Sequence, residues 1–458
     1  MNNRRVNAKL YSRLPSYILL TISAIGVLLF GADILMTSKG MASTIHEKHI
    51  NYDDELARIE QELDAKVKIS HLKPTSWLHL EAVANAYLQR ARLTGAFSDY
   101  MAAKSYINKA FNLAGENSGP YLTRAKINYS IHRLPDIEAD LVKAESALLI
   151  DNSTLATIKG IRADVLFHTA NALQAKSELE QLDRSSPDVT SATRLAHYYV
   201  YTANFNEADR WLEVAETRVD GTSHHLRSWL KLQKGIVDLE QGELEKALVH
   251  YEEGITLFPG YWLIEEHIAE IHALQGHYQK AEDAYRELIA RTNSPLFMSA
   301  LADVLSFSDV ASDQAEAREW QAKASHVYEL QSNQMPELLS GHALDHFLDN
   351  GEFDRAIELA KFDAELRPGG GNTLRLAQAY AAIGNVSYAT QLLDKLMASP
   401  YRSAELFSTA GVLYRHAQDT CSADDYDAQA LSINPKSVSD LDWLRERITT
   451  FKSAKSAS

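Results

Sequence analysis

Residues 235–259 read GIVDLEQGELEKALVHYEEGITLFP, and residues 269–292 read AEIHALQGHYQKAEDAYRELIART. The second stretch repeats the small, glycine and aromatic positions of the first one 34 residues later. The repeated positions are Gly235 and Ala269, Gly242 and Gly276, Ala247 and Ala281, and Tyr251 and Tyr285. After each glycine, the small and aromatic residues stand four apart and share one face of a helix, while the glycine itself marks a turn. The repeat therefore describes a helical hairpin.

A 34-residue period in two-helix units, closed by a proline such as Pro259, resembles the tetratricopeptide repeat (TPR) family. Similar units recur between Trp77 and Pro435, some with lengthened turns, and about ten of them can be counted. The resemblance implies an all-α fold, a right-handed α-solenoid of about ten TPR-like hairpins in which each hairpin covers the apolar face of its neighbour.

An apolar segment near the amino terminus predicts insertion into a membrane. The 20 residues from Tyr17 to Met36 contain a single charged residue, Asp33. As a helix they would extend roughly 30 Å, which is the thickness of the hydrocarbon layer of a bilayer. Residues 1–16 contain no acid and carry four cations, Arg4, Arg5, Lys9 and Arg13. Such a basic flank is typical of a cytoplasmic amino terminus, so the rest of the chain is expected on the other side of the membrane.

The segment from Tyr17 to Met36 can be an uncleaved transmembrane signal anchor or a cleaved signal peptide. No small-x-small cleavage site directly follows it, because Gly40 and Ala42 lie several residues too far along the chain. We therefore favour the anchor over both the cleaved peptide and a buried core helix. The anchor predicts a single-pass protein of the cytoplasmic (inner) membrane with a periplasmic carboxyl-terminal domain. Cleavage would make the protein periplasmic or secreted.

The remaining chain divides into a linker, the repeat domain and a tail. Residues 37–50 are polar and without a pattern, as expected of a tether. Residues 51–451 are predicted to form the TPR solenoid together with capping helices at both ends, the first of which begins near Asp53. Residues 452–458 are predicted to be disordered.

Charge and cysteine content exclude several classes of function. The formal net charge is -15, so most of the surface would repel a nucleic-acid backbone, and we expect no nucleic-acid partner. Cys421 is the only cysteine, which excludes an intramolecular disulfide and a thiolate metal cluster. No Gly-x-Ser-x-Gly nucleophile motif is present, and the glycines at 369–371 are not followed by a phosphate-binding Gly-Lys-Ser. The sequence therefore predicts neither an enzyme nor a cofactor.

Two histidine clusters are the candidate metal sites. His342 and His346 stand four apart and would share one face of a helix, with Asp345 and Asp349 nearby. This cluster lacks the glutamate of an HExxH zinc motif, so a metal-dependent enzyme or metal-binding protein is the alternative hypothesis and no metal ligand is assigned. The second cluster, His267, Glu270 and His272, is interpreted as structural, because a metal-binding helical bundle would need the motif twice.

The TPR resemblance also implies an inner groove lined mainly by the first helix of each hairpin. Counting helix positions from Gly235 and Ala269 assigns eight residues to a partner-binding groove: His197, Tyr201, Trp229, Leu232, Ile236, Leu239, Glu266 and Glu270. These positions combine apolar and acidic side chains, which favours a protein or peptide segment with hydrophobic anchors beside Lys or Arg. The alternative at each position is packing between helices.

The features together predict a non-enzymatic protein-protein interaction scaffold, tethered to the inner membrane and facing the periplasm. Two specific hypotheses fit it equally. The protein is either an assembly factor for a cell-envelope complex or a periplasmic holdase for an extended protein segment. The fold alone does not choose between them.

Overall fold

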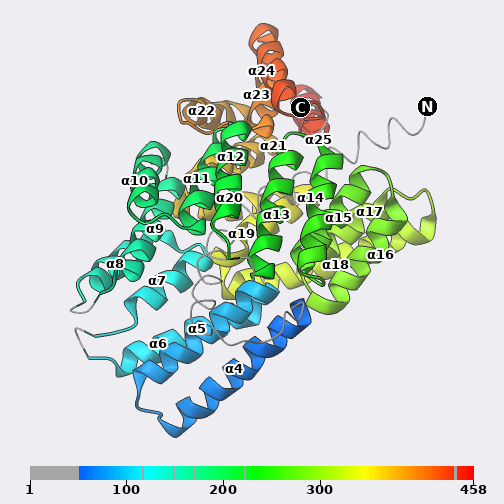
Figure 1. Cartoon of the computed structure of the whole chain (residues 1–458). Helices are drawn as coiled ribbons and strands as arrows, with labels where there is room; N and C mark the ends of the chain where they lie inside the picture. Colours follow the sequence, from blue (N-terminus) through cyan, green and yellow to red (C-terminus); the bar gives the residue numbers. More distant parts are fainter. Residues whose placement is uncertain are drawn as a thin grey trace.

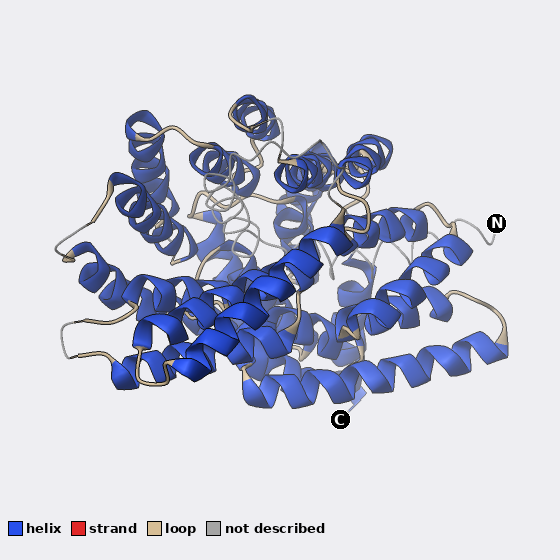
Figure 2. Ribbon diagram, turned by 60° about the horizontal axis from the view of Figure 1, so that its bottom comes forward, coloured by secondary structure: helices blue, strands red, loops and turns tan. Residues whose placement is uncertain are grey.

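The computed structural model describes residues 51–115, 118–147, 150–169, 171–220, 223–437 and 441–457. These residues form α-helices, one short 3-10 helix and connecting turns, and no strand is present among them (Figure 2). The predicted all-α class is therefore confirmed. The predicted anchor at Tyr17–Met36 lies outside the described residues. None of the helices within the described ranges is long and apolar enough to cross a membrane.

In the described part of the chain, ten helical hairpins follow one another between two further helices, α4 and α25 (Figure 1). The hairpins are α5(Trp77–Thr94) with α6(Phe97–Leu113), α7(Tyr121–Ser130) with α8(Ile137–Glu145), α9(Asn152–His168) with α10(Ala172–Ser185), α11(Val189–Tyr201) with α12(Phe205–Thr217), α13(His224–Glu240) with α14(Leu244–Leu257), α15(Trp262–Leu274) with α16(Tyr278–Thr292), α17(Pro295–Ser306) with α18(Ala311–Gln334), α19(Pro336–Asp349) with α20(Phe353–Leu366), α21(Gly370–Ala382) with α22(Val386–Met397), and α23(Ala404–His416) with α24(Thr420–Ile433). The 3-10 helix η1(Leu134–Asp136) lies between α7 and α8. Consecutive helices pack against each other, so the array is the TPR-like solenoid that the 34-residue period predicts.

The glycines of the repeat form the turns within the hairpins. Gly242 follows α13 with a φ of 74°, and Gly276 follows α15 with a φ of 81°. This left-handed conformation ends a helix without the steric cost that a Cβ atom would bring. The turn is short, so the two helices of each hairpin lie antiparallel and in contact.

The small and aromatic positions of the repeat form its close contacts. Ala247, Tyr251, Ala281 and Tyr285 are each 0% exposed. A Cβ atom built on Gly235 would lie 2.1 Å from Cε1 of Tyr251, which is far inside contact distance. Helix α13 can therefore approach α14 this closely only because residue 235 has no side chain.

The array curves until hairpins far apart in the sequence touch. The indole Nε1 of Trp262 on α15 donates a hydrogen bond of 2.8 Å to the carbonyl oxygen of Leu93 at the end of α5. The backbone N–H of Tyr52, the first residue of α4(Tyr52–Leu72), donates a bond of 3.0 Å to the carbonyl oxygen of Pro259. The amino-terminal end of α4 and the carboxyl-terminal end of α5 consequently lie beside the α13–α14 and α15–α16 hairpins (Figure 1). Contacts between hairpins that are far apart in the sequence therefore close the solenoid.

The last helix, α25(Asp442–Ala457), folds back onto the array. It packs against α21 and α23, and Arg447 Nε donates a bond of 3.1 Å to the carbonyl oxygen of Ala382. The helix also continues to Ala457, whereas the sequence predicts a disordered tail from residue 452 onward. The disorder of this tail stays a prediction.

Replacing Trp262 by Ala should open the closure between α5 and α15. The variant loses both the hydrogen bond to Leu93 and the ring that covers Gly95, at a cost of about 3 kcal/mol in the free energy of unfolding. We expect small-angle scattering to show a larger radius of gyration at unchanged helicity by circular dichroism. Trp320→Ala is the matched control, because the Trp320 indole bonds only within its own helix, to Glu316. An unchanged radius for Trp262→Ala would contradict the closure.

Candidate functional site

The predicted groove residues on α13 lie in the protein core. Trp229 and Leu232 are 0% exposed and Leu239 is 3% exposed, while Ile236 is partly buried. The three buried residues belong to the large apolar cluster that also contains Tyr251. A partner could reach them only if the surrounding helices moved apart. Counting helix positions identified the inner face of α13, but it could not show that this face is covered.

The two predicted groove residues on α11 pack against aromatic residues of other hairpins. The ring of His197 lies 5.6 Å from that of Phe167, and the ring of Tyr201 lies 4.6 Å from the same phenylalanine. Tyr201 also contacts Tyr401, with 4.9 Å between ring centroids, and its carbonyl oxygen accepts a bond of 3.0 Å from the N–H of Arg402. Tyr201 therefore contributes to the closure of the array, whereas His197 packs between the neighbouring helices α9 and α11.

Glu266, His267 and Glu270 form a buried cluster on α15. They occupy positions i, i+1 and i+4 of one helix and are exposed by 1%, 1% and 0%. The Nδ1 atom of His267 lies 3.3 Å from Oε2 of Glu270 and 3.6 Å from Oε2 of Glu266. The imidazole ring stacks on Tyr251, with centroids 5.1 Å apart and 15° between the planes. The structure thus brings together two predicted groove residues and one histidine of the second cluster, while His272 lies elsewhere, beside His277.

Most polar atoms of this cluster lack a hydrogen-bond partner among the described residues. These atoms are both carboxylate oxygens of Glu266, Oε1 of Glu270 and Nε2 of His267. Burial raises the pKa of Glu266 to about 8 and also raises the pKa of Glu270. For His267, burial lowers the pKa, but the two adjacent carboxylates outweigh it and the pKa is raised. A positive charge bound beside these buried carboxyl groups would therefore stabilise their ionised form.

Further carboxylates extend the acidic character of the inner face. Burial, followed by the repulsion from Glu405 and Glu270, raises the pKa of Glu240 to about 8. Burial also raises the pKa of Asp345 despite its ion pair of 3.0 Å with Arg375. Helices α13 and α19 thus each place a buried carboxyl group with a raised pKa inside the array.

His342 and His346 do not form the metal site of the alternative hypothesis. The hydroxyl of Ser299 donates to the carbonyl oxygen of Pro295, so it accepts from Nδ1 of His346, 2.8 Å away. Nε2 is then the acceptor for the hydroxyl of Ser325 at 2.7 Å. Both ring nitrogens of His346 are occupied, and burial lowers its pKa to about 4. His346 is a satisfied core histidine and not a ligand.

His342 belongs instead to a group of interior histidines. Burial is the main cause that lowers the pKa of His132 and His168 well below the usual value, and Arg367 lowers both further. The pKa of His342 falls to about 3, first through burial and then through Arg375 and Arg367. These histidines are neutral in the folded protein at neutral pH. They come from the second, third and eighth hairpins, so they lie where distant parts of the array meet.

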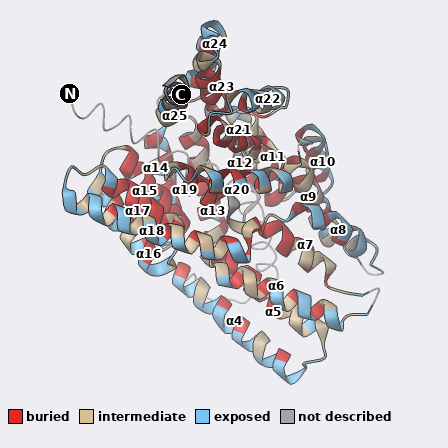
Figure 3. Cartoon of the chain, turned by 180° about the vertical axis from the view of Figure 1, so that it is seen from behind, coloured by how far each residue is buried: buried red, intermediate tan, exposed pale blue. Residues whose placement is uncertain are grey.

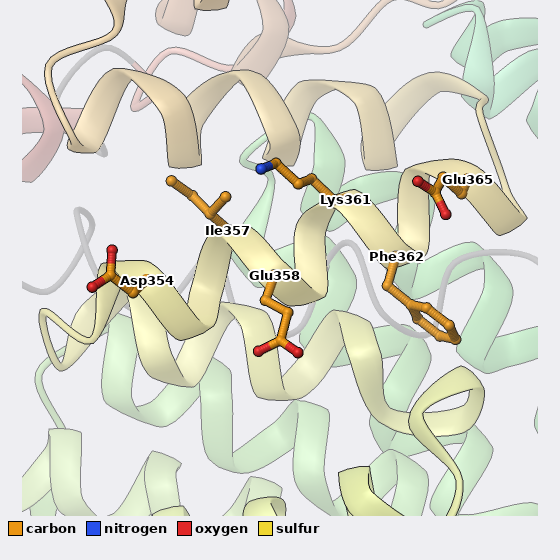
Figure 4. Close-up of a pocket in the computed structure, with 6 residues that line it drawn as sticks. All are labelled: Asp354, Ile357, Glu358, Lys361, Phe362 and Glu365. Atoms are coloured by element: carbon orange, nitrogen blue, oxygen red, sulfur yellow. The ribbon is translucent and has the colours of Figure 1, made fainter.

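A surface hollow of 460 Å³ lies along α20. Its lining residues are Asp354, Ile357, Glu358, Lys361, Phe362 and Glu365. Ile357 and Lys361 point toward the neighbouring helix, and Glu358 points away from it (Figure 4). All six residues come from one helix and their charged groups diverge, so the hollow does not form a binding site.

Comparison with known proteins yields structural neighbours only. No protein-family model matches the sequence, and no curated protein matches it either. A TPR protein from Parabacteroides merdae aligns at 15% identity and a TM-score of 0.33, covering 57% of this chain and 97% of its own. Human IFIT1, solved as a dimer with m7Gppp-AAAA, aligns at 14% identity and a TM-score of 0.40, covering 84% of this chain and 96% of its own. Cut9 from the APC/C complex Cut9-Hcn1 aligns at 16% identity and a TM-score of 0.36, covering 81% of this chain and 75% of its own.

The neutral state of His342 predicts a specific dependence of stability on pH. In an unfolded chain histidine binds a proton near pH 6.5, whereas His342 in the folded protein binds one only near pH 3. Between these values the unfolded state binds more protons, so the free energy of unfolding decreases as the pH falls. When the pH is lowered from about 7 to about 5, the free energy of unfolding measured in urea should decrease less for His342→Gln than for the wild type.

His326→Gln is the control for this experiment, since His326 is exposed on α18. It should keep the wild-type dependence on pH. Equal slopes for wild type and His342→Gln would show that His342 does not couple protonation to folding.

Proposed function

We propose that this protein is a non-enzymatic interaction scaffold, tethered to the outer side of a cytoplasmic membrane, that supports the assembly of a cell-envelope complex. The array of ten hairpins following a basic and then apolar amino-terminal segment is the observation that carries the proposal. A solenoid of hairpins presents a large surface without a catalytic centre, which suits the binding of another protein. Because both ring nitrogens of His346 are hydrogen-bonded within the protein, we favour the scaffold over the alternative, an enzyme at His342 and His346.

The acidic inner face supports a partner that carries Lys or Arg. Glu240, Glu405 and Asp345 each have a pKa raised by burial, so a cationic group that approached them would be favoured. The formal net charge of -15 would repel phosphates. Although the IFIT1 structures contain capped RNA, we propose a protein partner and no nucleic acid for this chain.

A second contact with the bilayer is part of this proposal. At the tip between α4 and α5, Leu72, Leu78 and Ile69 are 82%, 57% and 44% exposed. Residues 65–80 at this tip contain three lysines and no acid, in a chain whose net charge is -15. Exposed aliphatic side chains among cations fit the surface of a membrane with anionic lipids. The tip is among the most exposed parts of the array (Figure 3).

The orientation across the membrane can be tested with a fusion. A reporter that is active only outside the cytoplasm, fused after Ser43, should be active, because the basic flank retains residues 1–16 inside. The full chain should sediment with membranes, and a chain lacking the segment from Tyr17 to Met36 should not. A reporter that works only in the cytoplasm would reverse the proposed orientation.

The membrane contact of the tip can be tested with a polarity-sensitive fluorophore. The exposed Cys421 is first replaced by Ser, and Leu72→Cys then carries the label in the full chain inserted into nanodiscs. We expect a blue-shifted emission in discs with phosphatidylglycerol and a smaller shift in purely zwitterionic discs. Val249→Cys, at a residue 53% exposed on α14, is the control and should show no shift. Identical spectra at both positions would show that the tip stays in water.

A further inference from the structure

We propose that Glu266, His267 and Glu270 on α15 bind one divalent transition-metal cation of the Zn²⁺ class. The three side chains each offer one ligand atom, and these atoms all lie within 4.8 Å of one another. All three residues are at most 1% exposed. The proposal concerns a site inside the array and does not depend on the scaffold function.

The spacing of the donor atoms matches a metal centre. Two ligands about 2.1 Å from a tetrahedral Zn²⁺ are about 3.4 Å apart. The Nδ1 atom of His267 lies 3.3 Å from a Glu270 oxygen and 3.6 Å from a Glu266 oxygen. A cation placed between these atoms would meet two of the donor distances as they stand, and the two glutamate oxygens, which lie within 4.8 Å of each other, would have to close around it.

The charge of the cluster also points to a cation. Neither oxygen of Glu266 accepts a hydrogen bond within the described residues, and Oε1 of Glu270 likewise has no partner there. The ion pairs recorded for these two carboxylates in the described part of the chain involve only His267. Two buried carboxylates are costly without compensation, and one divalent cation would balance both charges.

The donor set indicates which metals fit. An imidazole with two carboxylates suits Zn²⁺ and neighbouring transition metals, whereas Ca²⁺ and Mg²⁺ require oxygen ligands alone. Three protein ligands leave a fourth position for water or for a group from a partner. Tyr251 supports the site by stacking on His267 and so fixing the orientation of the imidazole.

The alternative explanation for this cluster is an internal ion pair in which a protonated His267 pairs with both glutamates and no metal is bound. The same distances permit it, so the experiment must measure metal binding directly. In that case the chain would bind no stoichiometric Zn²⁺ at α15, and removing the carboxylates would not alter its metal content.

The test uses the full chain in detergent micelles, stripped of metal and titrated with Zn²⁺ against a chromophoric chelator. We expect one tight Zn²⁺ per chain, with affinity reduced about tenfold or more in Glu266→Gln or Glu270→Gln and lost in the double variant. Glu265→Gln is the matched control, because Glu265 lies on the same helix but pairs with Arg291. Its affinity should equal that of the wild type.

Two further measurements distinguish the loss of the metal site from the loss of the fold. If the double variant fails to fold by circular dichroism, His267→Phe replaces it, because a phenyl ring can still stack on Tyr251 but has no donor atom. Zn²⁺ should also raise the melting temperature of the wild type and not that of these variants. The proposal is overturned if the wild type binds no Zn²⁺, or if a folded variant without these donors binds it equally well.

Discussion

The close approach of a small residue on one helix to an aromatic ring on the next is the contact on which the whole array depends. At Gly235 the ring of Tyr251 lies where even a methyl group could not fit, with 2.1 Å to a built Cβ atom. A small residue and a tyrosine return 34 residues later as Ala269 and Tyr285, which are both 0% exposed, although alanine brings the methyl group that residue 235 could not carry. A fixed step between hairpins then accumulates into the curvature of the solenoid.

That curvature brings the array into contact with itself. The bond from Trp262 to the carbonyl of Leu93 joins residues 169 apart in the sequence, and Tyr201 meets Tyr401 in the same way. The inner positions of α13 are buried in the resulting structure, so Trp229 stabilises the core. The polar residues of the inner face, such as Glu266, are buried with it and are separated from the water that would normally solvate them.

The buried polar groups of this interior differ in the hydrogen bonds and counter-ions that compensate their burial. His346 is satisfied by two hydroxyl groups, and Asp345 has Arg375 as its counter-ion. Glu266 and Glu270 share one imidazole and leave three carboxylate oxygens without hydrogen bonds in the described chain. Of these three cases, the α15 cluster is the one whose carboxylates pair with no Lys or Arg in the described chain.

The sequence by itself determined the helical class, the number of hairpins and the residues of their close contacts, because these follow from a local period of 34 residues. It also placed Glu266 and Glu270 on one face of α15, since positions four apart share a face of a helix. Only the tertiary structure decided that Trp229 is buried, that His346 is satisfied by Ser299 and Ser325, and that His267 faces both glutamates. The physical reason is that small rotations between hairpins, which no local pattern encodes, add up to decide which distant surfaces meet.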